Sequence, residues 1–214
     1  MEVDMKEHQI RLPISTCRIR AGGGASVTSE SVVCPERGRS VDIDECLACV
    51  HCTHLRLAGP RDSFLGCDRE WPEAPAPPRD VLGTATVDTI MTRVVHCARG
   101  DLTLRELAGV LVDTGVGGVP VVDGHRHVIG VVSKTDLVQS LHDGLDPATT
   151  TVADVMAPLA FVLLERASIE RAAALMATEG VHRLPVVAPD GTLVGIVTAL
   201  DVARSVARDA GLGT

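Results

Sequence analysis

An internal repeat constrains the fold of this chain more strongly than any other feature of its sequence. Val87-x-x-Ile90-Met91 matches Val152-x-x-Val155-Met156, and Gly130-Val131-Val132-Ser133-x-x-Asp136 matches Gly195-Ile196-Val197-Thr198-x-x-Asp201, at one offset of 65 residues and without gaps. Such self-similarity indicates two copies of one supersecondary unit. Neither copy alone can bury enough apolar surface to be stable, so we expect the two copies to pack together.

Each copy has the same predicted order of elements. An apolar stretch (94–97 and 159–164) predicts a strand, and a Thr or Ser followed by apolar residues at helical spacing predicts a helix that ends at Gly115 or Gly180. Two β-rich runs then flank a turn that contains Asp-Gly, which is typical of a hairpin, and a short helix follows. The fold class predicted for this region is α+β, with two β-α-β-β-α motifs packed as a pseudo-symmetric pair.

These residues closely resemble the CBS (cystathionine-beta-synthase) domain pair. The resemblance rests on Met91-Thr92, Gly118-Val119-Pro120-Val121-Val122-Asp123 and Gly130-Val131-Val132-Ser133-x-x-Asp136, each with a partner 65 residues further on. It places one CBS motif at 84–143 and a second at 149–210. It implies a regulatory module with two clefts that often bind adenosine-containing nucleotides, and modules that often pair into a flat dimer.

The residues themselves also favour a nucleotide site. Ser133 and Thr198 each stand where a strand gives way to a helix, and free backbone N–H groups at such a junction bind anions. Three residues further on, Asp136 and Asp201 can accept hydrogen bonds from vicinal ribose hydroxyls. The same Ser/Thr-x-x-Asp spacing is also an ordinary helix cap that needs no ligand. Both interpretations remain open at this point.

The two copies differ at one informative place. Repeat two has His182-Arg183 where repeat one has Gly117-Gly118, and the resemblance implies that basic residues here reach phosphates. The alternative is a solvated turn between a helix and a strand. Repeat two also has Ala157-Pro158 where repeat one has Thr92-Arg93, so one cleft loses a hydroxyl contact. The candidate nucleotide-binding residues are Thr92, Val119, Pro120, Ser133, Asp136, His182, Arg183, Leu184, Pro185, Thr198 and Asp201.

Six of the seven cysteines precede a Pro-rich segment at 69–80. The spacing of Cys34, Cys46, Cys49 and Cys67 is typical of a four-thiolate zinc site and resembles a zinc ribbon or knuckle. Cys52 also places Cys46-x2-Cys49-x2-Cys52 at the start of an iron–sulfur ligand run, and a third possibility is reduced or redox-active thiols without metal. His51 and His54 are further candidate ligands. Cys17 and Cys97 lie in apolar surroundings and are expected to be packed in the core.

The composition shift near residue 80 predicts three parts. Residues 1–70 form a cysteine-rich metal-binding domain, 71–83 form a Pro-rich linker, and the two CBS motifs follow. A net charge of -8 and an aromatic content of one Trp, two Phe and no Tyr argue against a nucleic-acid partner. The longest apolar run, Leu159–Leu164, is too short to cross a membrane, and the first residues lack the apolar core of a secretory signal. We therefore expect a cytoplasmic protein.

Two functional hypotheses follow. The first is a regulatory or sensory module that binds an adenosine nucleotide, either AMP, ADP, ATP or S-adenosylmethionine, and acts in trans on a partner protein. The alternative is a metal or redox sensor whose CBS pair serves as a dimerisation scaffold. We expect no enzyme, because the sequence has no nucleophile motif, no Walker A loop and no dinucleotide fingerprint. A homodimer is expected from the apolar faces of the repeat helices.

Overall fold

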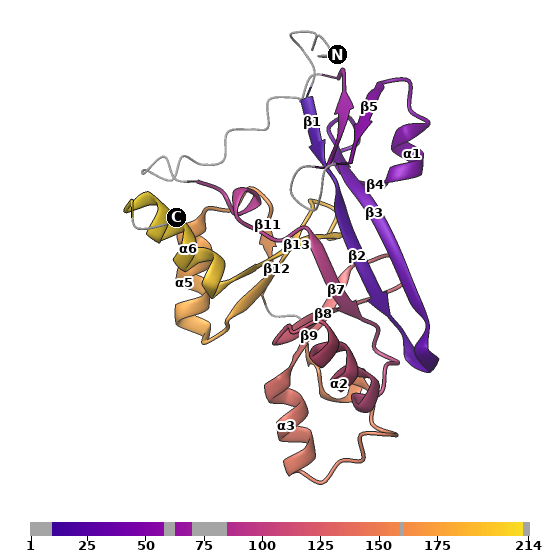
Figure 1. Ribbon diagram of the computed structural model, residues 1–214, viewed down its shortest axis with the longest axis vertical. Helices are drawn as coiled ribbons and strands as arrows, with labels where there is room; N and C mark the ends of the chain where they lie inside the picture. Colours follow the sequence, from indigo (N-terminus) through magenta and orange to yellow (C-terminus); the bar gives the residue numbers. More distant parts are fainter. Residues whose placement is uncertain (1–9, 58–62, 70–84, 159–160, 212–214) are drawn as a thin grey trace.

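The computed structural model describes residues 10–57, 63–69, 85–158 and 161–211 (Figure 1). The linker predicted at 71–83 lies outside the described residues. Repeat one contains η2 (Val87–Thr89), β7 (Val94–Ala98), α2 (Leu104–Asp113), β8 (Gly118–Val122), β9 (Val128–Ser133) and α3 (Lys134–His142). Repeat two contains α4 (Val152–Val155), β10 (Ala157–Pro158), β11 (Leu163–Leu164), α5 (Ile169–Glu179), β12 (Arg183–Val187), β13 (Leu193–Thr198) and α6 (Ala199–Asp209). The predicted β-α-β-β-α order is confirmed in both copies, and within the described part of the strand expected at 159–164 the structure has β11 at Leu163–Leu164.

Local sequence explains where the repeat helices begin and end. At the start of α2, the Glu106 amide donates to Thr103 Oγ1 at 3.3 Å and the Thr103 amide donates to Glu106 Oε2 at 3.0 Å, so both ends of the predicted capping box are made. Leu104, Leu107 and Leu111 form the buried face. Just beyond α2, Gly115 has a φ of 70°, which is a left-handed conformation that glycine adopts without strain.

Backbone bridges between the two repeats follow a two-fold relation. Thr92 pairs with Ile196, and Ala157 pairs with Val131 in the contact between β10 and β9. Each of these two pairs is converted into the other by the 65-residue offset. The segment after the first Met of each copy therefore hydrogen-bonds to the last strand of the other copy, and the two motifs are interlocked rather than merely adjacent.

The same symmetry relates two methionines to two glycines. A Cβ added to Gly195 would lie 2.5 Å from Met91 Sδ, and a Cβ added to Gly130 would lie 2.7 Å from Met156 Sδ. Each methionine thus packs directly on the backbone of the last strand in the other repeat. This contact explains why both copies carry glycine there, because any side chain would have to displace the thioether.

The N-terminal segment is not separate from the repeats. Its elements are β1 (Ile10–Pro13), β2 (Ser15–Arg20), η1 (Gly22–Gly24), β3 (Ser26–Cys34), β4 (Arg39–Asp42), α1 (Ile43–Leu47), β5 (Cys52–Arg56) and β6 (Phe64–Cys67). Strands β2, β3 and β4 continue the sheet of repeat one in the order β10-β9-β8-β7-β2-β3-β4. Repeat two keeps a sheet of its own, β11-β12-β13, and β1, β6 and β5 form a third sheet.

The division expected near residue 80 therefore marks a change of composition, and strands from both sides of it share one sheet and one core. β2 pairs in parallel with β7, and its inward residues Cys17 and Ile19 pack with Val95, Cys97 and, from repeat two, Leu193. The expectation that Cys17 and Cys97 are buried is confirmed, and their sulfur atoms lie 2.7 Å apart. The physical reason is the open edge of β7, whose backbone groups need a partner.

Candidate functional site

A cleft of about 500 Å³ lies between the two repeats, and residues from both of them line it. Repeat one contributes Ser133 and Asp136 at the start of α3, and repeat two contributes His182, Arg183 and Leu184 at the start of β12. Five of the residues selected from the sequence therefore meet in one cavity. The volume lies in the usual range for small-molecule sites, about 300–1,000 Å³.

Asp136 is held by a capping box at the mouth of this cleft. Its Oδ2 accepts from the Ser133 amide at 2.7 Å and from Ser133 Oγ at 2.7 Å. Its own amide donates to Ser133 Oγ at 3.4 Å. Among the described residues nothing donates to Oδ1 of Asp136. The capping interpretation is thus confirmed, and it leaves one carboxylate oxygen available to a ligand.

Thr198 and Asp201 repeat this arrangement in the second copy. Asp201 Oδ2 accepts from the Thr198 amide at 2.9 Å and from Thr198 Oγ1 at 2.6 Å. Thr92 lies beside them, because it pairs with Ile196 in the strand that ends at Thr198. The sequence assigned Thr92, Thr198 and Asp201 to a nucleotide cleft. The structure places these three at the position related by the pseudo-two-fold symmetry to that of Ser133 and Asp136, and Arg183 lies with Asp136 rather than with them.

Arg183 is half-buried, and its guanidinium lies against the glycines of repeat one. A Cβ on Gly117 would lie 2.6 Å from Arg183 Nη2, and a Cβ on Gly118 would lie 2.5 Å from Nη1. Burial lowers the pKa of Arg183, and the negative charge of Asp136 raises it. The Arg183 head is therefore a poorly solvated cation beside a carboxylate, in the cleft with Asp136.

The basic residues of repeat two do not lie with the aspartate of their own repeat. His182, Arg183 and Asp201 all belong to repeat two, so a division by repeat would place them in one cleft. The structure places His182 and Arg183 with Asp136 of repeat one, because the two motifs interlock. His182 is exposed at the rim, whereas Arg183 reaches inside.

Three other selected residues contribute differently. Val119 and Pro120 in β8 and Pro185 in β12 are buried strand residues and are absent from the lining of this cleft. Leu184, which is also buried, does line it. Sequence reasoning treated each Val/Leu-Pro pair as a flat support for a base, whereas most of these side chains pack within the sheets.

The cleft also contains residues that sequence reasoning missed. Val131, Thr135, Pro158 and Phe161 line it, together with Ala157. The repeat itself held a signal for two of these, since Ala157-Pro158 occupies the position of Thr92-Arg93 in the first copy. Phe161 had no such signal, because it aligns with His96 and lies in a stretch predicted to be a strand. It supplies an aromatic side chain to a chain that has very few.

Four cysteines of the N-terminal segment gather in one apolar cluster. Cys46 and Cys67 are buried in it, and Cys34 and Cys52 pack against it. Burial first, and then the nearby thiols, Cys52 foremost among them, together raise the pKa of Cys46 to about 11. Within the ranges that the structure describes, no three His, Cys, Asp or Glu side chains are arranged to hold a metal ion. The predicted thiols are thus neighbours, but they do not form a preassembled tetrahedral site.

The CBS domain model matches residues 87–143 and 152–208, which is more than half of the chain. The chain therefore belongs to the CBS domain family, as the repeat, the interlocked fold and the inter-repeat cleft together indicate. The tandem pair expected from the sequence is confirmed. The zinc ribbon expected before it has no counterpart in the family match.

Three relatives illustrate the range of this family. An uncharacterised protein of Methanopyrus kandleri is 32% identical over 56% of this chain and 62% of its own length. Hypoxic response protein 1 of Mycobacterium tuberculosis is 31% identical over 56% of this chain and 83% of its own, and it has been solved with two coordinated zinc ions (30% identity, 98% of that chain, TM-score 0.52). The CBS-pair protein CBSX2 of Arabidopsis thaliana, solved in complex with AMP, is 31% identical over 58% of this chain and 98% of that chain, with a TM-score of 0.52.

These similarities concern the repeats more than whole proteins. The chain spans 62% of the Methanopyrus kandleri relative and 64% of the chloroplastic protein CBSX1 of Arabidopsis thaliana. In the described part of the chain, no helix combines the length and apolar character that a membrane span requires.

Proposed function

We propose that this chain is a regulatory CBS-pair module that binds an adenosine nucleotide in the cleft between its repeats and acts in trans on a partner protein. The proposal rests chiefly on one observation. The half-buried Arg183 cation and the free Oδ1 of Asp136 face the same 500 Å³ cavity. A phosphate can pair with the guanidinium, and ribose hydroxyls can donate to the carboxylate.

Two further features of the cleft support a nucleotide. Ser133 caps α3, so the positive end of that helix dipole faces the ligand. Phe161 adds an apolar ring to the lining. The related protein CBSX2 binds AMP, and we extend that property to this chain as part of the proposal.

The test is calorimetric titration of AMP into the wild type and into two variants. Asp136→Asn and Arg183→Ala should each weaken binding about ten- to hundredfold, the value of a hydrogen bond to a charged group. A 2′-deoxy analogue should show a similar loss on the wild type and little further loss on Asp136→Asn, because both changes remove the same bond. Unchanged affinity in both variants would refute the assignment.

Asp201→Asn is the matched control for this experiment. It alters the same type of capping box in the other repeat, but Asp201 does not line the cleft that contains Arg183. A general effect on helix stability would appear in Asp201→Asn as well, whereas a ligand contact in this cleft would appear only in Asp136→Asn. The melting temperature of the empty proteins should be similar in both.

A second role concerns the cysteine cluster, which we propose binds one zinc ion through Cys34, Cys46, Cys49 and Cys67. Cys34, Cys46 and Cys67 share one cluster, and Cys49 lies near enough to raise the pKa of Cys46. Soft thiol donors favour zinc, and a bound cation would offset the cost of forming several thiolates together. Protein purified without added metal should contain about one zinc per chain by elemental analysis, and Cys49→Ser should lose it. Absorbance near 400 nm would indicate an iron–sulfur cluster instead, and a metal-free, ordered segment would refute both.

The metal or redox sensor remains the competing function. In that case chelator or oxidant, and not nucleotide, would change the thermal stability of the repeats. A bound nucleotide at about a hundredfold excess over Kd stabilises a protein by about 2.7 kcal/mol, which a thermal shift detects.

We place the protein in the cytoplasm, where thiols stay reduced.

A further inference from the structure

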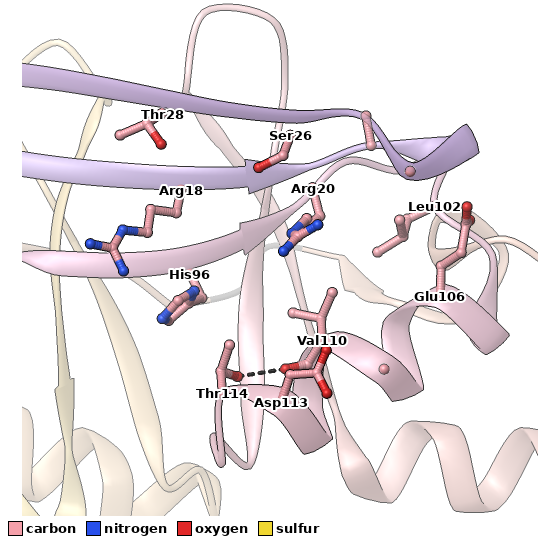
Figure 2. Close-up of a pocket in the computed structure, with 13 residues that line it drawn as sticks. Arg18, Arg20, Ser26, Thr28, His96, Leu102, Glu106, Val110, Asp113 and Thr114 are labelled. Atoms are coloured by element: carbon pink, nitrogen blue, oxygen red, sulfur yellow. Dashed lines mark hydrogen bonds between the residues drawn. The ribbon is translucent and has the colours of Figure 1, made fainter.

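A second pocket lies on the outer face of the seven-stranded sheet, away from the cleft between the repeats. Its volume is about 320 Å³, and it lies between strands β2, β3 and β7 and helix α2. Figure 2 shows Arg18 and Arg20 on the same side of the sheet as His96, facing the helix that carries Val110 and Asp113. We refer to Arg18, Arg20, Ser26, Thr28 and His96 as the sheet pocket.

The strand register places these side chains in two rows. Thr28, Arg18 and His96 lie directly opposite one another on β3, β2 and β7, and Ser26 lies opposite Arg20 in the next row of the same face. Two basic residues directly opposite on neighbouring strands repel each other and destabilise the sheet. In the part of the chain that the structure describes, no carboxylate forms an ion pair with Arg18, Arg20 or His96. The sheet thus holds three nitrogen-rich side chains together without a counter-ion from the protein.

We propose that the sheet pocket binds a small organic phosphate, with its phosphate group held by Arg18, Arg20 and His96. Ser26 and Thr28 add hydroxyl donors at the edge of this basic group. Leu102 and Val110 give the far wall an apolar surface against which a carbon skeleton can lie. Such a site lies outside the nucleotide cleft and draws on the N-terminal strands, so both parts of the chain contribute to it.

The acidic residues of α2 define how the ligand is oriented. Glu106 is already engaged, since it accepts from the Thr103 amide at 3.0 Å and from the Gly23 amide at 3.0 Å. Asp113, at the end of α2, lines the pocket and has no hydrogen-bond donor among the described residues. An anionic group must therefore lie toward β2 and β7, and hydroxyl groups on the carbon skeleton can donate to Asp113. The chemistry favours a hydroxylated phosphate ester, such as a sugar phosphate.

Protonation of His96 should accompany binding. Burial and the positive charges of Arg18 and Arg20 lower the pKa of His96, so the empty pocket disfavours the protonated imidazole. Glu106 and Asp113 are the facing acids, and neither forms an ion pair with it. A bound dianion would raise the pKa of His96, so affinity should increase as pH falls through the range in which histidine titrates.

Two probes test the proposal by calorimetry: ribose 5-phosphate, which lacks a base, and sulfate, whose charge is constant over this pH range. Both should bind saturably to the wild type. Arg18→Gln and Arg20→Gln should each weaken both probes about ten- to hundredfold. Asp113→Asn should weaken ribose 5-phosphate but not sulfate. His96→Gln should remove the pH dependence of sulfate binding.

The controls separate this site from the nucleotide cleft and from general electrostatics. Arg56→Gln removes the same charge from an exposed strand of another sheet and should leave binding unchanged. In Arg183→Ala, the binding that depends on Arg18 and Arg20 should persist unchanged, even if the cleft proves to bind no nucleotide. Without ligand, and at a pH low enough to protonate His96, Arg18→Gln should raise the melting temperature by about 1–3 °C, because it relieves the repulsion between the two opposed cations. No saturable binding, or binding lost only in Arg183→Ala, would overturn the proposal.

Discussion

Glycine and arginine at equivalent positions of the two repeats form one structural unit. Gly117-Gly118 and His182-Arg183 are related by the 65-residue offset, yet the Arg183 head fills the space that side chains at 117 and 118 would need. A basic pair in both copies would place two long side chains in the same space near the two-fold relation. The absence of side chains in repeat one is thus what allows Arg183 to enter the cleft.

This arrangement predicts different effects for substitutions of the two neighbouring glycines. A Cβ at Gly117 would meet only the mobile end of Arg183, so Gly117→Ala should weaken AMP binding while changing the free energy of unfolding little. A Cβ at Gly118 would also lie 2.7 Å from the Val132 carbonyl oxygen and 2.8 Å from Ser133 Cα. Gly118→Ala should therefore destabilise the protein by about 1–3 kcal/mol, measured by urea unfolding. Equal destabilisation by both variants would contradict this account.

At the scale of single elements, β2 is the strand that joins the N-terminal segment to the repeats. Its outward residues build the sheet pocket, and its inward residues Cys17 and Ile19 belong to a core shared with both repeats. Ile19 is 8% exposed and touches the cluster that contains Val95 and Leu193. A destabilising substitution in β2 should therefore lower the stability of the whole sheet.

Ile19→Ala should lower the free energy of unfolding by about 2–5 kcal/mol, the usual cost of truncating a buried isoleucine. Near-UV circular dichroism and urea titration should show one cooperative transition in which the repeats unfold with the N-terminal strands. Val27→Ala is the control, because Val27 is 58% exposed on the adjacent strand and should change stability by less than about 0.5 kcal/mol. An unchanged midpoint for Ile19→Ala would show that β2 is dispensable.

At the scale of the whole molecule, the two repeats are related by pseudo-two-fold symmetry, and the N-terminal strands break this symmetry because they extend only one of the two sheets. The sheet of repeat one is extended by β2, β3 and β4, whereas that of repeat two has three strands. The last helix of each repeat also exposes apolar side chains. Leu141 in α3 and Val206 in α6 are equivalent under the 65-residue offset, and they are 52% and 62% exposed. Exposed apolar surface of this kind is typical of an interface.

We predict a homodimer with isologous contacts through α3 and α6. Light scattering at micromolar concentration should give twice the chain mass for the wild type, and Leu141→Glu with Val206→Glu should give the monomer mass, because a buried carboxylate opposes association. Val50→Glu, which alters a side chain that is 88% exposed outside these helices, should remain dimeric. A monomeric wild type, with and without AMP, would refute the prediction.

Features determined by local pattern could be predicted from the sequence. The 65-residue offset, the capping boxes at Thr103, Ser133 and Thr198, and the glycine after α2 follow from residues close together in the chain. The β-α-β-β-α order was predictable for the same reason, because it depends on hydrogen bonds and periodicity that span a few residues. The assignment of His182 and Arg183 to a cleft came instead from the resemblance to the CBS domain pair.

Only the tertiary structure decided which residues meet. Arg183 lies with Asp136 rather than Asp201 because the motifs exchange their Met-containing segments across the two-fold relation, and a repeat alignment cannot show that exchange. The pairing of β2 with β7 could not be predicted from the sequence either. The composition change near residue 80 suggested a domain boundary, and hydrogen bonding at a sheet edge leaves no local sequence pattern. The sheet pocket depends on this register, since Arg18 and His96 become neighbours only when the two strands align.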